Sequence, residues 1–274
     1  MAIPIQTHIS VARAPLPPNK FFLDKPDEVK EIFGVEDPLK VARAHGERIG
    51  AGSIKEIYKI KLNGKEWALK AYLPGDDIDP VLLELSARPI LKRIFQGTNA
   101  FTPIAYGLEG SGKCPVLLSE FLTGFSAIGK GEIFDGIGTR DAASLELAFS
   151  APVIHISNLD SFFIKRDHDG NNPTIGVIDL ESLLYLGDLP DGPDSKLPIL
   201  FIEESQKDNH DYPKIRSDFA RAWLQRISEE PFRGELEQEI QMQTGAWLGQ
   251  TSSRLILGKV ALASEQYYDR VRID

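Results

Sequence analysis

The first pattern able to do chemistry is a glycine pair followed by a lysine on the next expected strand. Gly50, Gly52 and Ser53 lie between two short runs that are typical of strands, and Lys70 ends the following run, WALK. Because glycine has no Cβ, backbone N–H groups beside it can come close to phosphate oxygens. Lys70 would point its ammonium group at the same phosphates. The pattern therefore predicts a phosphate-binding turn with a lysine behind it.

A carboxylate in the second half of the chain could complete such a site. Asp179 ends the apolar run GVI. A carboxylate at the end of a strand can hold a Mg²⁺ ion that bridges two phosphates. An aspartate at a strand end is often only a turn residue, but the order of Asp179 after Gly50, Lys70 and Glu120 favours the metal role.

These residues resemble the pattern of the protein-kinase-like superfamily, including its small-molecule kinases of the aminoglycoside-phosphotransferase type. The protein-kinase motif G-x-G-x-x-G-x-V, followed by V-A-I-K, is matched by the two glycines, by Ile57 and by the run WALK. Lys55 stands where the third glycine would be. The resemblance covers about residues 46–186, and the tripeptide that begins at Asp179 is similar to that of small, atypical kinases of the bacterial or effector type.

The resemblance implies roles for three further residues. Glu84, the only acid in the run VLLELSARP, would hold Lys70 in place. The backbone of the hinge run LLSEFLTG would hydrogen-bond adenine, with Glu120 and Leu122 facing the base. ATP and Mg²⁺ are the implied cofactors, and a hydroxyl group on a protein or a small molecule is the implied acceptor.

The catalytic loop of the family, H-x-D-L-x-x-x-x-N, is altered in this chain. Aligning on His155 places Ser157 at the aspartate, whereas aligning on Leu159 places Asn158 there. A neutral side chain can orient a hydroxyl group but cannot take its proton as a carboxylate does. Asp160 is the only carboxylate between His155 and the run FFI, and it could serve as base or as second metal ligand.

Two functions therefore stay open. In the first, the chain is an ATP- and Mg²⁺-dependent phosphotransferase that uses Lys70, His155, Asn158 and Asp160 in catalysis, with Asp160 sharing the metal with Asp179. In the second, the chain is a pseudokinase that binds nucleotide and acts as a regulatory or protein-interaction module. The difference is large, because general-base help is worth about 10²–10⁴-fold in rate.

A P-loop NTPase is a weaker alternative. The run GLEGSGKC differs from G-x-x-x-x-G-K-[ST] by Cys114 at the position of the hydroxyl residue. A helix must follow a phosphate-binding loop so that its N-terminus points at the phosphates. Here Pro115 introduces VLLSEFL, which is typical of a strand, so EGSGK is better interpreted as a hairpin turn.

The elements that must position these residues are strands in the first half of the chain and helices in the second. Asn63-Gly64 predicts a hairpin between SIKEIYKIKL and EWALKAYL, with ERIGAG as the preceding strand. TPIAYGLE and CPVLLSEFLTG are two further expected strands, and FFIKR and TIGVIDLE form another pair. Short helices are expected over 25–46, and VLLELSARPILKRIF is expected to form a helix weakened by Pro89. TRDAASLELAF and three runs after about 212 complete the expected helices.

This order predicts an α+β, protein-kinase-like fold with two lobes. We expect a loose tail over 1–24 and an N-terminal lobe over 25–122, with a five-stranded antiparallel sheet and one helix. A mainly helical and reduced C-terminal lobe is expected over 123–274, with the nucleotide between the lobes. The prediction requires the hairpin at 46–72 to lie over the strand end at Asp179.

Composition narrows the function classes. The net charge of −9 and the pI near 5.2 disfavour a nucleic-acid partner. No apolar run approaches the roughly 20 residues that a membrane span needs. The single cysteine, Cys114, excludes an intramolecular disulfide and suggests a reducing compartment.

The N-terminus bears on location. It lacks the basic start, apolar core and cleavage site of a secretory signal, so we expect a cytoplasmic protein. The first acid is Asp24, and the acid-free, proline-bearing stretch before it resembles the export signals of bacterial type III effectors. The alternative is therefore a secreted effector that acts on a protein of a host cell.

Overall fold

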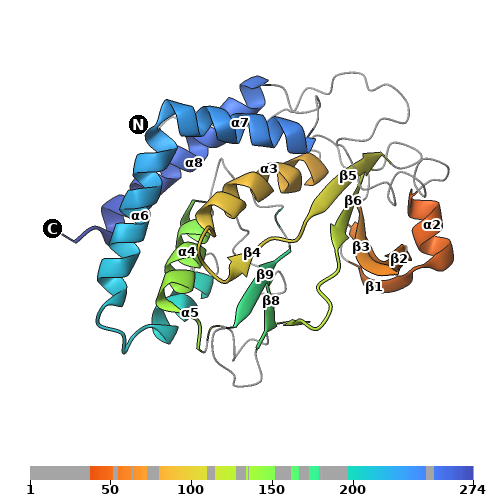
Figure 1. Cartoon of the computed structure of the whole chain (residues 1–274), viewed down its shortest axis with the longest axis horizontal. Coiled ribbons are helices and arrows are strands. Elements are labelled where there is room, and N and C mark those ends of the chain that lie inside the picture. The colour runs from red at the N-terminus through yellow and green to blue at the C-terminus, as the bar shows by residue number, and fades with distance from the viewer. Residues whose placement is uncertain are drawn as a thin grey trace, which may run out of the picture.

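The computed structural model of the chain describes residues 38–51, 55–62, 64–72, 80–109, 115–127, 134, 136–151, 162–166, 173–178, 180, 197–244 and 250–273. Within these ranges the protein is α+β, as predicted. A five-stranded antiparallel sheet and one long helix come first, and a smaller sheet and a group of helices follow (Figure 1). The expected tail over 1–24 lies outside the described residues.

The five-stranded sheet has the order β1-β2-β3-β6-β5. The predicted hairpin joins β2 to β3, with Leu62 opposite Lys65 and with Gly64 in the left-handed region at a φ of 81°. A side chain other than glycine rarely adopts that conformation, which explains the turn signal. All five predicted strands are present, and their bounds are β1 (Glu47–Ala51), β2 (Lys55–Leu62), β3 (Lys65–Tyr72), β5 (Ala105–Glu109) and β6 (Pro115–Glu120).

Two helices pack against this sheet. The short helix α2 (Pro38–His45) buries Val41 and Ala42 against one face, in a core with Trp67 and Leu69 of β3. The long helix α3 (Pro80–Ile94) follows β3 and packs Val81 and Leu85 against the sheet, in a second core. Together the helices place apolar cover on the sheet that carries Lys70.

The expectation that Pro89 weakens α3 is wrong, because the helix is continuous through this residue. Proline lacks the N–H that would bond the carbonyl of Leu85 and normally bends or ends a helix. The side chains from Val81 to Leu91 are all buried. Burial on several sides thus outweighs the lost hydrogen bond, as tertiary packing commonly does for helices.

The smaller sheet has the order β4-β9-β8-β7. The predicted pair is present as β8 (Phe162–Lys165) and β9 (Thr174–Val177). β4 (Ala100–Phe101) pairs in parallel with β9, and β7 (Ser126–Ala127) pairs with β8. The short strands β4 and β7 do not appear among the predicted elements.

The helical part begins with α4 (Thr139–Ser150), as predicted. The three predicted C-terminal helices are present as α6 (Tyr212–Ser228), α7 (Glu230–Thr244) and α8 (Gln250–Val271). A further helix, α5 (Leu197–Ser205), was not predicted. None of the helices in the described ranges combines the length and the apolar character that a membrane span requires.

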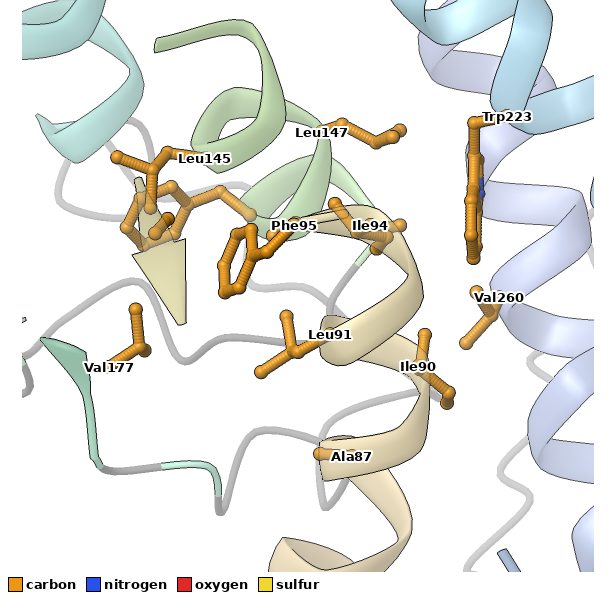
Figure 2. Close-up of a cluster of buried hydrophobic side chains, with 14 of the residues drawn as sticks. Ala87, Ile90, Leu91, Ile94, Phe95, Leu145, Leu147, Val177, Trp223 and Val260 are labelled. Carbon is orange, nitrogen blue, oxygen red and sulfur yellow. The ribbon is translucent and has the colours of Figure 1, made fainter. Parts of the chain in front are cut away.

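The largest core lies where α3 meets the smaller sheet and the helices. Figure 2 shows the side chains of α3 pointing in two directions from the helix. Leu91 and Phe95 point toward the smaller sheet and α4, whereas Ile90 and Ile94 point toward α6 and α8. The side chains that they approach are Leu145, Leu147, Val177, Trp223 and Val260. α3 therefore forms the central support for the strand that precedes Asp179.

A buried acid joins α4 to α6. Glu146 is buried, and it accepts hydrogen bonds from the hydroxyl group of Tyr212 and from the Arg216 guanidinium, which is 3.2 Å away. Burial raises the pKa of Glu146 above its ordinary value, although both partners oppose the shift. Burial and the nearby Glu146 also raise the pKa of Tyr212. The cluster fixes these two helices at the cost of burying a carboxyl group.

Candidate functional site

Lys70 and Glu84 form a buried ion pair between β3 and α3. Lys70 lies opposite Ile57 of β2 and Leu117 of β6, in the middle of the sheet. Its Nζ donates to Glu84 Oε1 at 2.9 Å and to Oε2 at 3.0 Å. The two side chains are 3% and 0% exposed. The ion pair expected between these residues is therefore present, and its role in binding nucleotide remains a prediction.

Two further donors hold the Glu84 carboxylate. The Tyr72 hydroxyl donates to Oε2 at 2.7 Å, and Arg88 Nη2 donates to Oε1 at 2.7 Å. Arg88 also donates through Nη1 to the carbonyl of Pro103, which precedes β5. A buried carboxylate is costly unless its oxygens accept hydrogen bonds of this kind. The carboxylate that holds Lys70 is thus itself fixed from the sheet and from its own helix.

Tyr72 and Arg88 are not among the predicted site residues, although the sequence carries a signal for each. Tyr72 lies two residues after Lys70, so both side chains leave the strand on the same face. Arg88 lies four residues after Glu84, which places the two on one face of the helix. A search two residues along the strand from Lys70 and four residues along the helix from Glu84 would have identified both.

Lys70 also reaches the end of β9. Its Nζ donates to the carbonyl oxygen of Ile178 at 2.6 Å. Ile178 follows β9 and directly precedes Asp179 in the sequence. The hairpin of β2 and β3 thus lies over this strand end, as the fold prediction requires. Asp179 itself lies outside the described residues.

Gly50 lies in β1 opposite Ile57, next to an irregularity in the register between β1 and β2. A Cβ added at Gly50 would meet Ile57 Cδ1 at 3.5 Å, an ordinary van der Waals contact. Packing therefore does not require glycine at this position. Gly52 and Ser53, the other residues of the predicted phosphate-binding turn, lie outside the described residues.

The predicted hinge run, 117–124, covers the end of β6 and the residues that follow it. The backbone N–H of Glu120 donates to the carbonyl of Ile104 at 2.9 Å, and the Glu120 carboxylate pairs with Lys65 of β3. Leu122 approaches β9 so closely that a Cβ added at Gly176 would lie 2.5 Å from Leu122 Cδ1. Leu122 is thus placed against the strand that precedes Asp179. That Glu120 and Leu122 face a nucleotide base remains a prediction.

The remaining predicted site residues cannot be placed. His155, Asn158 and Asp160 of the altered catalytic loop lie outside the described residues, as does Lys113 of the alternative P-loop.

The strand after the alternative P-loop argues against that interpretation. β6 starts at Pro115 and pairs with β5 and β3. A strand thus follows the run GLEGSGKC where a P-loop NTPase needs a helix. Within the described ranges, no three or more His, Cys, Asp or Glu side chains are grouped so that they could hold a metal ion.

Comparisons with known proteins give low-level structural likenesses. No protein-family model matches the chain, and no curated protein matches it. WaaP in complex with acyl carrier protein is 15% identical, over 91% of this chain and 99% of that chain, with a TM-score of 0.36. The Helicobacter pylori proinflammatory kinase CtkA is 10% identical, over 84% and 97%, with a TM-score of 0.46. The PknI kinase domain of Mycobacterium tuberculosis is 15% identical, over 79% and 94%, with a TM-score of 0.31. Likenesses at this level assign no family.

Proposed function

We propose that this protein is a kinase-like phosphotransferase that binds ATP and Mg²⁺ beside Lys70. The contact that carries the proposal is made by the Lys70 ammonium group. It joins the Glu84 carboxylate of α3 to the strand end just before Asp179. A lysine fixed in this way by a helix carboxylate can present its positive charge to phosphate oxygens.

The surrounding elements support a polyphosphate ligand at this point. Two cations, Lys70 and Arg88, share the single carboxylate of Glu84, so this buried group does not repel an anion. Gly50, near the end of β1, has no side chain at a position where packing would tolerate one. We therefore assign the Gly50, Gly52 and Ser53 turn to the phosphates. Glu120 and Leu122 of the hinge are assigned to the base.

The metal and the catalytic loop rest on the sequence. We assign Asp179 as the Mg²⁺ ligand, with Asp160 as base or second ligand and with His155 and Asn158 in the same loop. Bound Mg²⁺ would neutralise charge on the phosphates during transfer. The chain's own contribution is positioning: Glu84 orients Lys70, and Asp160 takes or orients the hydroxyl proton of a protein or small-molecule acceptor.

Binding of Mg-ATP to the full chain by isothermal titration calorimetry tests the nucleotide site. We expect Lys70→Met to weaken binding at least 10-fold, since the lysine is placed against the phosphates. Lys61→Met is the matched control, because Lys61 is an exposed lysine on the adjacent strand β2. Circular dichroism should show both variants folded, since Glu84 keeps Tyr72 and Arg88 as donors. Equal binding by Lys70→Met and the native chain would contradict the proposal.

Mass spectrometry after incubation with Mg-ATP separates the two functions that share this site. Phosphate on the protein itself, lost in Lys70→Met, supports transfer. We expect Asp160→Asn to reduce this signal about 10²-fold or more while ATP affinity changes little, because base help acts in the transition state. Nucleotide binding without phosphate on the protein or on any offered acceptor would favour the pseudokinase, working as a regulatory module.

A further inference from the structure

A cavity lies beside α3, one helical turn beyond Glu84. It has a volume of about 670 Å³ and lies between α3, the segment 100–105 and the C-terminal half of α7. Figure 1 shows α7 lying along α3, with β5 close to both helices. Cavities of roughly 300–1,000 Å³ are typical of small-molecule sites. The predicted nucleotide site does not include any residue of this cavity.

The wall of the cavity is mostly apolar. Ile104 and Met242 line it, and their side chains are 56% and 58% exposed. They come from segments that are distant in the sequence, the stretch before β5 and helix α7, but they line the same cavity. Phe101 and Pro103 add further apolar surface. Large exposed side chains that gather at one cavity point to a ligand with an apolar body.

Two cations of α3 line the same cavity. Lys92 is exposed and forms no ion pair with any residue that the structure describes. Arg88 is only 5% exposed, and in the described part of the chain its Nε–H has no hydrogen-bond acceptor. The one carboxylate in the wall, Glu239, is already paired with Arg93. The charge of the wall therefore favours an anionic head group.

We propose that this cavity binds a small amphiphilic carboxylate. The apolar body would lie against Ile104 and Met242, and the carboxylate would lie at Lys92, next to the Arg88 guanidinium. Because Arg88 also donates to Glu84, the cavity and the Lys70 pair share one side chain. The binding itself does not depend on the proposed function.

Isothermal titration calorimetry of the full chain without nucleotide tests this site, with sodium dodecanoate below its micelle concentration as the probe. We expect one dodecanoate per chain, and at least 10-fold weaker binding of dodecyltrimethylammonium, which carries the opposite charge on the same tail. Met242→Glu should weaken dodecanoate binding about 10-fold or more, because it places a carboxylate in the apolar wall. Leu262→Glu is its control, since Leu262 of α8 is 55% exposed and does not line the cavity.

Charge reversal provides a second pair of variants. Lys92→Glu should weaken dodecanoate binding about fivefold or more. The change replaces the exposed ion pair between Lys92 and the carboxylate of the bound dodecanoate by a repulsion between two carboxylates. Lys214→Glu is the control, because Lys214 is an exposed lysine on α6 away from the cavity. Absence of binding would overturn the proposal. So would equal binding of the cationic probe, or an equal loss in the control variants. The dodecanoate results test the cavity alone, whether or not Lys70→Met changes the binding of Mg-ATP.

Discussion

Replacing Glu84 tests the stability of the buried group around Lys70. In Glu84→Ala, the side chains of Lys70 and Arg88 lose their shared carboxylate, and the Tyr72 hydroxyl loses its acceptor. Breaking a buried ion pair by removing one partner costs about 3–5 kcal/mol. Two cations are left here, so we expect the upper end of that range. Such a loss is a large part of the free energy of unfolding of a typical domain, which is about 5–15 kcal/mol.

Other replacements in the same group should cost less. Tyr72→Phe removes one hydrogen bond to a charged acceptor, which is worth about 1.5–3 kcal/mol. Glu84→Gln keeps the shape and an acceptor oxygen, so its loss should lie below that of Glu84→Ala. Glu66→Ala is the control, because Glu66 of β3 forms a partly exposed pair with Lys59 at 2.7 Å. Such pairs contribute about 0.2–1 kcal/mol.

Equilibrium unfolding in urea, followed by circular dichroism, measures these differences in the free energy of unfolding. The slope against urea concentration should stay constant across the variants, so that the midpoints report stability alone. The expected order of loss is Glu84→Ala, then Tyr72→Phe, then Glu66→Ala. If Glu84→Ala fell within about 1 kcal/mol of Glu66→Ala, well below the cost of breaking a buried ion pair, the argument that a tightly bonded buried group fixes Lys70 would be refuted.

Three further predictions follow from single positions. Gly50→Ala should unfold at the same urea concentration as the native chain, since the added Cβ would lie 3.5 Å from Ile57 Cδ1, an ordinary contact. Calorimetry should nevertheless show weaker binding of Mg-ATP to this variant. Unchanged binding would argue against the phosphate-binding turn. Gly176→Ala should lower the free energy of unfolding by about 1–3 kcal/mol through overpacking against Leu122, and Leu122→Ala in the same chain should recover part of that loss. The native chain should lose stability relative to Glu146→Gln as the pH rises from about 4.5, because burial raises the pKa of this carboxyl in the folded state and the folded form therefore favours the proton. Urea midpoints measured from pH 4 to pH 8 check this trend, and a native chain that gains stability relative to Glu146→Gln as the pH rises would contradict it.

Much of the sheet could be predicted because its signals are local. Asn63-Gly64 fixes the hairpin, and the run WALK places Lys70 on the following strand. Glu84 could be predicted as its partner because the resemblance implies a helix glutamate and Glu84 is the only acid in that helical run. Each of these inferences uses residues close together in the chain or one pattern of known spacing.

The elements that were missed depend on distant parts of the chain. β4 and β7 have two residues each, too few to show a strand period, and they exist because β9 and β8 lie beside them. α5, with the sequence LPILFIEES, begins with a run of apolar residues that does not alternate between polar and apolar faces. The continuity of α3 through Pro89 depends on burial by sheet and helices together. A local sequence pattern does not indicate any of these contacts.

The buried group around Lys70 supports a binding function more directly than a catalytic one. Apolar residues of similar volume would fill the space between β3 and α3 at less cost than a buried lysine, carboxylate and arginine, because desolvation of charges is expensive. The proposed binding of an anion by the Lys70 ammonium, which lies at the strand end before Asp179, would explain why these charges are present. An active phosphotransferase and a pseudokinase would both need this arrangement. The two proposed functions assign different roles to the loop from His155 to Asp160, so a variant of Asp160, rather than of Lys70, is the one that tests whether a bound phosphate is transferred.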